Sequence, residues 1–227
     1  MFLSPQKISE LKPFRYELKI PLEKVQFNEF KHSLKQLGIH PVQAYPRRQI
    51  NSVYFDSYDF NDYVDNVSGI ADRRKTRIRW YNEDIKALTL EFKIKKNKAS
   101  YKESLKLKNP DGHDPRTRRG VRNIMENHMG TMERLILQNV RPVLEVQYMR
   151  TYSMLDKDLR MTIDVEQKFR RLYPHPSQSL KRSPVYCVVE FKFPAIKREA
   201  MQSLMRNIPF RVFRHSKYVI GMDTIAP

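Results

Sequence analysis

Basic residues at alternate positions are the first feature of this sequence that could do chemistry. In the stretch DRRKTRIRWY, residues 72–81, the cations of one parity are Arg73, Lys75, Arg77 and Arg79. Because successive side chains of a β-strand point to opposite faces, this spacing predicts a strand with one cationic face and one apolar face. Arginine binds phosphate through paired hydrogen bonds and lysine acts as a point charge. The chemistry to expect is therefore recognition of a polyanion.

The same alternation recurs along the chain. The charged faces carry Arg15, Glu17 and Lys19; Glu91, Lys93 and Lys95; Arg160, Asp164 and Glu166; and Glu190 and Lys192. Any one such strand is ordinarily the solvated face of a sheet. If the sheet closes into a barrel, however, the charged faces point inward together. An interior rich in Arg and Lys repels itself when empty, so the pattern predicts a charged tunnel for a phosphate chain, in which the few carboxylates could hold a divalent metal.

Composition limits the alternatives. The chain has 227 residues, 40% of them hydrophobic, and a formal net charge of +18. This charge predicts a polyanionic partner, which can be nucleic acid, an anionic membrane or a phosphate chain. The single cysteine, Cys187, lies beside Val188 and Val189, which indicates a buried thiol and fits a cytoplasmic, reducing location. No apolar run reaches the length of a membrane-spanning helix, so any membrane association is expected to depend on a partner protein.

The elements that must position these residues follow from the same periodicities. We expect strands at 14–20, 50–56, 72–81, 88–96, 141–153, 159–169 and 185–193, and helices at 21–38, 116–139 and 195–207. Residues 57–69 read as a turn or short helix, and 97–110 as less regular chain. No linker or repeat is found, so residues 1–227 are expected to form a single domain of the α+β class, with an antiparallel sheet and covering helices.

The ordered set of motifs resembles a known family. RYELKI, SVYFDSYDFNDY, RIRWY, LEFKIKK, YMRTY, LRMTIDVE, VVEFKFP and HSKY are similar to the VTC (vacuolar transporter chaperone) domain, the polyphosphate polymerase branch of the triphosphate tunnel metalloenzymes, or CYTH-like superfamily. The resemblance runs from about residue 14 to residue 221. It implies an antiparallel eight-stranded β-barrel, the triphosphate tunnel, with flanking helices and a bound Mn²⁺ or Mg²⁺ ion.

The resemblance also implies roles for individual residues. The residues expected to act on the phosphates in catalysis are Arg77, Arg79, Lys93, Arg150, Arg160 and Lys217. Further substrate-binding residues are expected at Arg15, Lys19, Lys75, Lys102, Lys192 and Ser216, with Lys106 as an alternative to Lys102. Glu190 and Glu17 are the expected metal ligands. One mismatch stands out, because Arg150 shares its parity with Tyr148 and not with Glu145, which requires a bulge or a different strand assignment.

The implied function is that of a polyphosphate polymerase, which transfers the terminal phosphate of ATP to phosphate or to a growing chain. The alternatives are a triphosphatase using the same tunnel, or a non-catalytic polyphosphate-binding module. Hydrolytic members carry E-x-E-x-K on the first strand, whereas this chain has Arg15 at the first acidic position. The lost carboxylate favours the polymerase.

Expected partners are ATP or triphosphate, and polyphosphate, with a membrane protein as a further candidate. Nucleic acid is not expected, because Trp80 and Phe92 lie opposite the cations. We interpret the basic segments 93–108 and 116–122 as solvated surface, with binding of polyphosphate leaving the tunnel as the alternative. Asp164 is expected to orient an arginine, Asp56 to serve a turn or cap, and His215 to pack.

Overall fold

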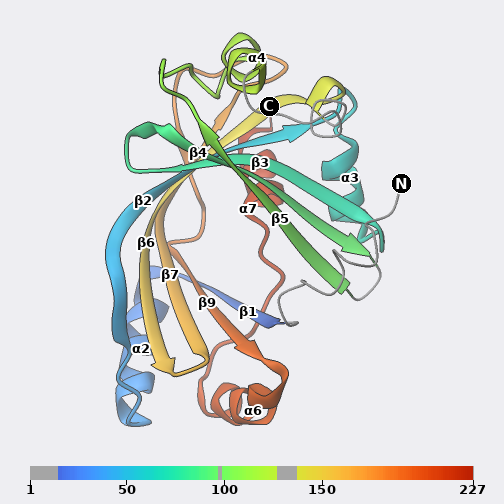
Figure 1. Cartoon of the computed structure of the whole chain (residues 1–227). Helices are drawn as coiled ribbons and strands as arrows, with labels where there is room; N and C mark the ends of the chain where they lie inside the picture. The colour runs from blue at the N-terminus through green and yellow to red at the C-terminus, as the bar shows by residue number, and fades with distance from the viewer. Residues whose placement is uncertain (1–14, 97–98, 127–136, 227) are drawn as a thin grey trace.

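One long antiparallel sheet organises the computed structural model, which describes residues 15–96, 99–126 and 137–226 (Figure 1). Its strands are β1 (Arg15–Leu22), β2 (Val42–Asp56), β3 (Arg73–Tyr81), β4 (Asp84–Lys96), β5 (Ala99–Lys108), β6 (Arg141–Asp156), β7 (Leu159–Arg171), β8 (Lys181–Arg182) and β9 (Cys187–Pro194). The helices are α2 (Lys24–Gln36), α3 (Asn61–Ser68), α4 (Arg118–Glu126), α6 (Arg198–Asn207) and α7 (Lys217–Ile225), with a 3₁₀ turn at Ala195–Lys197. The α+β class expected from the sequence is confirmed.

Eight of the strands follow one hydrogen-bonded path, β1-β9-β7-β6-β2-β3-β4-β5, and β8 pairs with β7 at its side. The expected barrel is present as a curved sheet whose ladder does not close, since no pairing joins β1 to β5 within the described residues. The free edge of β1 meets the segment before α7, where the Phe213 amide donates to the Lys19 carbonyl at 2.9 Å. The edge of β1 is therefore bordered by the chain before α7 rather than by another strand of the sheet.

Helices cover the convex face of the sheet, as the apolar parity of the strands requires. On β1, β7 and β9, this face packs against α2 and α6 through residues that include Ile20, Phe191, Phe30 and Met201. On β2 to β5, it packs against α4 through a second cluster with Trp80, Phe92 and Ile124. Trp80 and Phe92 are 1% and 5% exposed. The charged side chains at the alternate strand positions therefore face the concave side.

The last helix, α7, lies against the concave face (Figure 1). Tyr218 and Ile225 pack there with apolar residues of β2, β6 and β7. Gly221 makes the close approach possible, because a Cβ atom at this position would lie 2.6 Å from Leu144 Cδ2 and 2.8 Å from Phe169 Cδ1. The helix fills the apolar part of the interior and leaves the rest to charged side chains.

Three elements differ from the sequence expectation. The stretch 97–110 was expected to be less regular chain, which is wrong, because Ala99–Lys108 forms β5 and pairs with residues 87–96 of β4. Strand β2 begins at Val42 rather than residue 50, and register shifts on both sides of Tyr45 accommodate Pro46. Helix α4 begins at Arg118 after Thr117, whose Oγ1 accepts a hydrogen bond from the Gly120 amide. Much of the remainder of the expected helix, 127–136, lies outside the described residues.

The single cysteine behaves as expected. Cys187 is a free, fully buried residue, and burial raises the pKa of its thiol to about 12. Among the described residues, no helix is long and apolar enough to cross a membrane.

Asp56 ties α3 and α7 to the end of β2. Its buried carboxylate accepts hydrogen bonds from the amides of Ser57 at 2.7 Å and of Asp62 and Tyr63 at 2.9 Å. The hydroxyl of Tyr218 on α7 donates to the same carboxylate. Asp56 therefore serves the turn and caps α3, as the sequence indicated.

We expect Asp56→Ala to lower the free energy of unfolding by about 3 kcal/mol, because it leaves several buried hydrogen-bond donors without an acceptor. The exposed Asp59 in the same turn provides a matched control, and Asp59→Ala should leave stability nearly unchanged. Urea denaturation of the three proteins checks this. Equal midpoints for Asp56→Ala and the wild type would contradict the assignment.

Candidate functional site

The concave face of the sheet gathers the charged side chains that alternation selected. We call these residues the inner wall: Glu17, Lys19, Lys75, Arg77, Arg79, Glu91, Lys93, Lys102, Arg150, Arg160, Asp164, Glu190 and Lys192, with Ser216 and Lys217 at the start of α7. Cross-strand register places them on one face, as in the row Glu17–Lys192–Arg160. Arg15 lies on β1 opposite Pro194, but its side chain is outside the described part of the chain.

One cluster lies on β3, β4 and β5 around Glu91. Arg77 donates to Glu91 Oε2 from Nε at 2.6 Å, and Lys102 Nζ lies 2.6 Å from Oε1. Arg79 Nη1 is 3.6 Å from the same carboxylate. Burial disfavours the Glu91 carboxylate, but Arg77 and Arg79 outweigh this and hold its pKa well below the usual range. The carboxylate fixes three cations that would otherwise repel one another.

A second cluster surrounds Asp164, whose side chain is fully buried. Arg150 of β6 donates to it through two hydrogen bonds of 2.5 and 2.7 Å, and Lys217 Nζ of α7 lies 2.5 Å away. Burial raises the pKa of Asp164, but Arg150 and Lys217 overcome this and lower it to about 2. Asp164 thus orients an arginine, as the sequence indicated, and also anchors the first residue of α7.

A third cluster joins the two ends of the sheet. Lys19 Nζ lies 2.6 Å from Glu17 and 3.9 Å from Glu190, and Lys192 Nζ lies 2.5 Å from Glu190. Lys93 of β4 reaches across to Glu17 of β1 at 3.6 Å. This ion pair spans the unclosed side of the sheet, so the inner wall surrounds the interior even where the ladder does not.

The position of Arg150 resolves the parity mismatch seen in the sequence. Arg150 faces the interior together with Tyr148, whereas Glu145 lies on the opposite face of β6. A register shift between Gln147 and Met149 relative to β7 brings Arg150 opposite Asp164. The strand assignment was therefore correct, and Glu145 belongs to the outer side.

The remaining predicted residues take different positions. Lys75 Nζ donates to Ser216 Oγ at 2.8 Å, which joins β3 to the N-cap of α7. Arg160 is exposed at the rim of the inner wall, opposite Lys192. Lys106 also faces the interior and contacts Thr89 Oγ1 at 3.4 Å, so both alternatives on β5, Lys102 and Lys106, point inward.

Several interior residues were missed by the sequence analysis. Arg48 of β2 pairs with Arg150, and its guanidinium carbon lies 4.1 Å from the ring centre of Tyr81 and 5.0 Å from that of Tyr152. Tyr54 accepts a hydrogen bond from Arg77 at 2.8 Å. Arg48 could not be selected, because it lies in the part of β2 that was not recognised as a strand.

His215 is a buried, uncharged neighbour of the inner wall. It is 6% exposed, and its carbonyl accepts a hydrogen bond from Lys19 at 3.1 Å. Burial, together with Lys217 and Lys19, lowers its pKa to about 3. It packs as the sequence indicated, and it adds no positive charge at neutral pH.

The carboxylates fit a metal ion only in company with a ligand. Glu17 and Glu190 lie on neighbouring strands with Lys19 between them, and the buried Glu190 Oε1 lies 2.5 Å from Lys192 Nζ. No group of three or more His, Cys, Asp or Glu that could hold a metal is found in the described part of the chain. Magnesium is commonly held by one or two carboxylates plus substrate phosphates, so Glu190 and Glu17 suit that mode.

Taken together, the inner wall offers cations in excess of carboxylates, held in place from several strands. Such an arrangement can grip a chain of phosphoryl groups and neutralise negative charge that develops on them. The serine of the inner wall, Ser216, has a structural use, because its Oγ accepts hydrogen bonds from Lys75 Nζ at 2.8 Å and from the Val219 amide as the N-cap of α7.

Comparison with known proteins agrees with this geometry. A family model described as the VTC domain matches residues 14–226. No curated protein matches the chain. Among solved structures, "putative" adenylate cyclases from Vibrio parahaemolyticus and Bacillus halodurans share 12% and 13% identity, each with a TM-score of 0.55. These alignments cover 92% and 90% of this chain and 97% and 94% of theirs.

A third structure is a Hippeastrum protein described as a "putative" adenylyl cyclase with a dominant triphosphatase activity. It has 12% identity and a TM-score of 0.54, and the alignment covers 92% of this chain and 94% of that one. Identity this low establishes a shared fold and nothing further.

The crowding of cations makes ligand binding dependent on protons. Burial, with Lys93, Lys19, Arg73 and Arg77 nearby, lowers the pKa of Lys75 to about 7. A bound polyanion restores the charged form, so above pH 7 we expect tripolyphosphate binding to take up a proton and to weaken as pH rises. Calorimetry at pH 8 in buffers of different ionisation enthalpy measures this uptake.

Lys75→Met is the control, and it should reduce the uptake. In the free protein, the lowered pKa means that the folded state binds fewer protons than the unfolded state. Stability should then rise with pH from about 7 toward the ordinary lysine range, and less so in Lys75→Met. Identical proton uptake by the two proteins would contradict the assignment.

Proposed function

Because the chain belongs to the VTC domain family, whose model covers residues 14–226, we propose that its inner wall is a triphosphate tunnel. We propose further that the protein is a metal-dependent phosphotransferase, a polyphosphate polymerase. It transfers the terminal phosphoryl group of ATP to inorganic phosphate or to a growing polyphosphate chain.

The observation that carries this proposal is the pairing of the inner-wall carboxylates. Glu17, Glu91, Asp164 and Glu190 each form an ion pair with Lys or Arg. A carboxylate held in this way, with a lowered pKa, is a poor base for activating water. A phosphate acceptor is already an anionic nucleophile and is attracted by the surrounding cations. The geometry therefore favours transfer to phosphate over hydrolysis.

In the transfer step, the acceptor oxygen forms a bond to the terminal phosphorus as the bond from that phosphorus to the bridging oxygen breaks, and ADP leaves. Arg77 and Arg79 from β3 and Arg150 from β6 lie on the two strands that flank β2 and would contact the phosphates from there. Lys93, Lys102 and Lys217 add charge from β4, β5 and α7. Catalysis is then positioning and electrostatic stabilisation, without a covalent protein intermediate.

Lys19, Lys75, Lys192 and Ser216 complete the proposed substrate contacts, with Arg160 at the rim. Glu190 and Glu17 would hold Mn²⁺ or Mg²⁺, which when bound supplies charge neutralisation across phosphate oxygens. A cytoplasmic location and a membrane-protein partner stay predictions.

A triphosphatase using the same tunnel is the second candidate. The Hippeastrum structure of similar fold is described as having a dominant triphosphatase activity. The two candidates share the substrate site and differ in the acceptor, so their products separate them.

We expect purified protein with ATP and Mn²⁺ to form long anionic chains, detected by gel electrophoresis, and little free phosphate. Arg77→Ala should reduce turnover by roughly a hundredfold or more, since one preorganised charge partner of the transition state is lost. Arg119→Ala, on the exposed side of α4, is the matched control. Free phosphate alone would favour the triphosphatase, and wild-type activity in a folded Arg77→Ala protein would contradict the tunnel assignment.

Glu190→Gln tests the proposed metal ligand without changing side-chain size. We expect tripolyphosphate binding without metal to persist or strengthen, because a negative charge is removed from the cationic wall. The effect of added Mn²⁺ on binding and on activity should be lost. Titrations of both proteins with Mn²⁺ check this, and an unchanged titration would place the metal elsewhere.

A further inference from the structure

A second cationic site lies on the outer side of the sheet. A cavity of about 410 Å³ opens between the loop before α4, the start of β6 and the end of β7. Its lining includes the arginines Arg116, Arg118, Arg141 and Arg170. We call this cavity the outer pocket. Its volume falls in the range of small-molecule sites, roughly 300–1,000 Å³.

Two of the arginines are fixed by one carboxylate. Glu145 is 0% exposed, and it accepts hydrogen bonds from Arg116 Nε and Arg170 Nε, each at 2.7 Å. The Arg116 guanidinium also lies 4.9 Å from the Trp80 ring and donates to Asp114 at 3.1 Å. Both guanidinium groups are therefore held in place before any ligand arrives, which lowers the entropy cost of binding.

A third arginine is held between two rings. The guanidinium carbon of Arg141 lies 4.5 Å from the ring centres of both Tyr58 and Tyr173. Its buried Nε has no hydrogen-bond partner among the described residues. The aromatic faces position the cation but supply no counter-anion.

Arg118 adds charge at the mouth of the pocket. It is exposed and is the first residue of α4, where the positive end of the helix dipole lies. No ion pair or hydrogen bond of its side chain is found within the described ranges. Among the described residues, the carboxylates paired with these arginines are those of Glu145 and the half-exposed Asp114. The pocket thus keeps an uncompensated positive charge, which a bound anion would offset.

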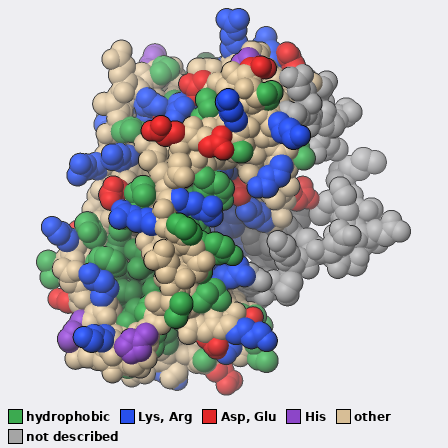
Figure 2. All heavy atoms as spheres, turned by 60° about the vertical axis from the view of Figure 1, so that its left-hand side comes forward, with side chains coloured by type: hydrophobic (Ala, Val, Ile, Leu, Met, Phe, Trp, Pro, Cys, Tyr) green, Lys and Arg blue, Asp and Glu red, His purple; other side chains and the backbone are tan. Residues whose placement is uncertain are grey.

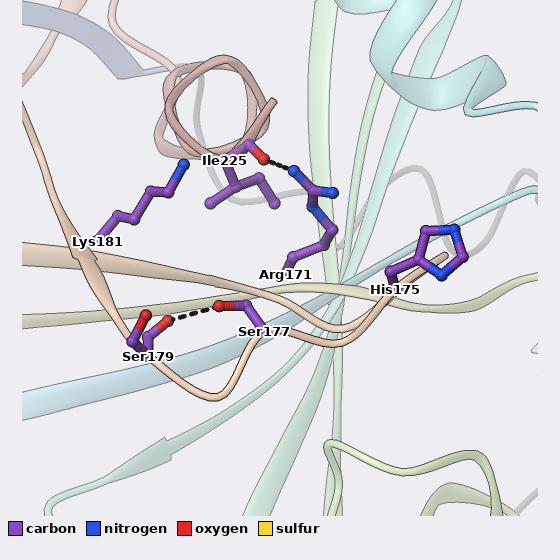
Figure 3. Close-up of a pocket in the computed structure, with 6 residues that line it drawn as sticks. All are labelled: Arg171, His175, Ser177, Ser179, Lys181 and Ile225. Carbon is purple, nitrogen blue, oxygen red and sulfur yellow. Dashed lines mark hydrogen bonds between the residues drawn. The ribbon is translucent and has the colours of Figure 1, made fainter. Parts of the chain in front are cut away.

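A neighbouring cavity contains an arginine whose guanidinium is already used in a structural hydrogen bond. A cavity of about 200 Å³ beside the end of α7 is lined by Arg171, His175, Ser177, Ser179, Lys181 and Ile225 (Figure 3). There the Arg171 guanidinium donates to the Ile225 carbonyl and closes the C-terminal end of α7. Ser177 borders both cavities. In the outer pocket, by contrast, Arg118 has no such bond within the described ranges, and Arg141 is held by aromatic rings without a counter-anion.

We propose that the outer pocket is a separate, non-catalytic binding site for an inorganic oligophosphate, which it recognises through at least two adjacent phosphoryl groups. Arginine forks match phosphate oxygens in geometry, and four of them converging from three segments suit more than one phosphoryl group. The site lies on the face of β6 opposite Arg150, so it does not share residues with the inner wall.

Trp80 provides a direct reporter, because it is the only tryptophan of the chain and contacts Arg116. Titration of the full chain with tripolyphosphate, at constant ionic strength, should change its fluorescence saturably. The response should persist in Lys93→Ala/Lys102→Ala, which weakens the inner wall at two half-exposed lysines. The titration of this double variant therefore tests the outer-pocket proposal independently of the proposed tunnel.

Arg118→Glu should weaken this binding by roughly tenfold or more. The change is safe for the fold, since an acidic residue in the first turn of a helix is favourable. Arg119→Glu makes the same charge change on the same helix, outside the pocket lining, and should bind like the wild type. Equal affinities for Arg118→Glu and Arg119→Glu, loss of the response in the lysine double variant, or an equal response to sulfate would each overturn the proposal.

Pyrophosphate and long-chain polyphosphate identify the source of the phosphoryl groups. Saturation by pyrophosphate at concentrations like those of tripolyphosphate supports a site for a small effector anion. Affinity that climbs with chain length supports a site for the polymer itself.

Discussion

The whole interior depends on buried carboxylates that are shared among cations. Cations drawn from several strands face one another across a confined space, where their repulsion is weakly screened. Glu91 and Asp164 answer this by each bridging arginine and lysine residues of different elements. Without them, these cations would face one another in a confined space with less negative charge between them. The same ion pairs set the geometry of the site and part of the stability of the fold.

The carboxylates offset only part of the positive charge of the interior. The inner wall carries more Lys and Arg than carboxylates, so its charge is only partly neutralised, and the pKa values of Lys75, Lys93 and Lys102 are lowered. Burial is the first cause of each shift, and neighbouring cations add to it. Phosphate oxygens can supply the missing negative charge without rearranging the wall. The charged side chains of the outer surface are less concentrated: Figure 2 shows Lys and Arg spread over one face with carboxylates among them.

Strict alternation made β1, β3, β4 and β9 predictable, because one apolar face and one charged face leave a single way to orient the strand. Strand β5 followed the same rule through Leu105 and Leu107, but its many lysines hid it. The start of β2 was obscured by Pro46, and with it Arg48. The pairing of Lys75 with Ser216 and of Lys93 with Glu17 depends on how α7 and the sheet ends meet, which no local pattern encodes. The outer pocket likewise needs residues 114–118, 141 and 170 to converge.

The pairing of Lys93 with Glu17 has a mechanical consequence. Elsewhere around the interior, backbone hydrogen bonds hold neighbouring strands at a fixed separation of about 4.8 Å. Between β1 and the β4–β5 hairpin, long side chains span the junction instead. The sheet curves around the interior but is not closed by backbone hydrogen bonds between β1 and β5 within the described residues. The width of the interior at that junction therefore depends on attraction between charges, which dissolved salt screens, whereas backbone hydrogen bonds hold the other junctions.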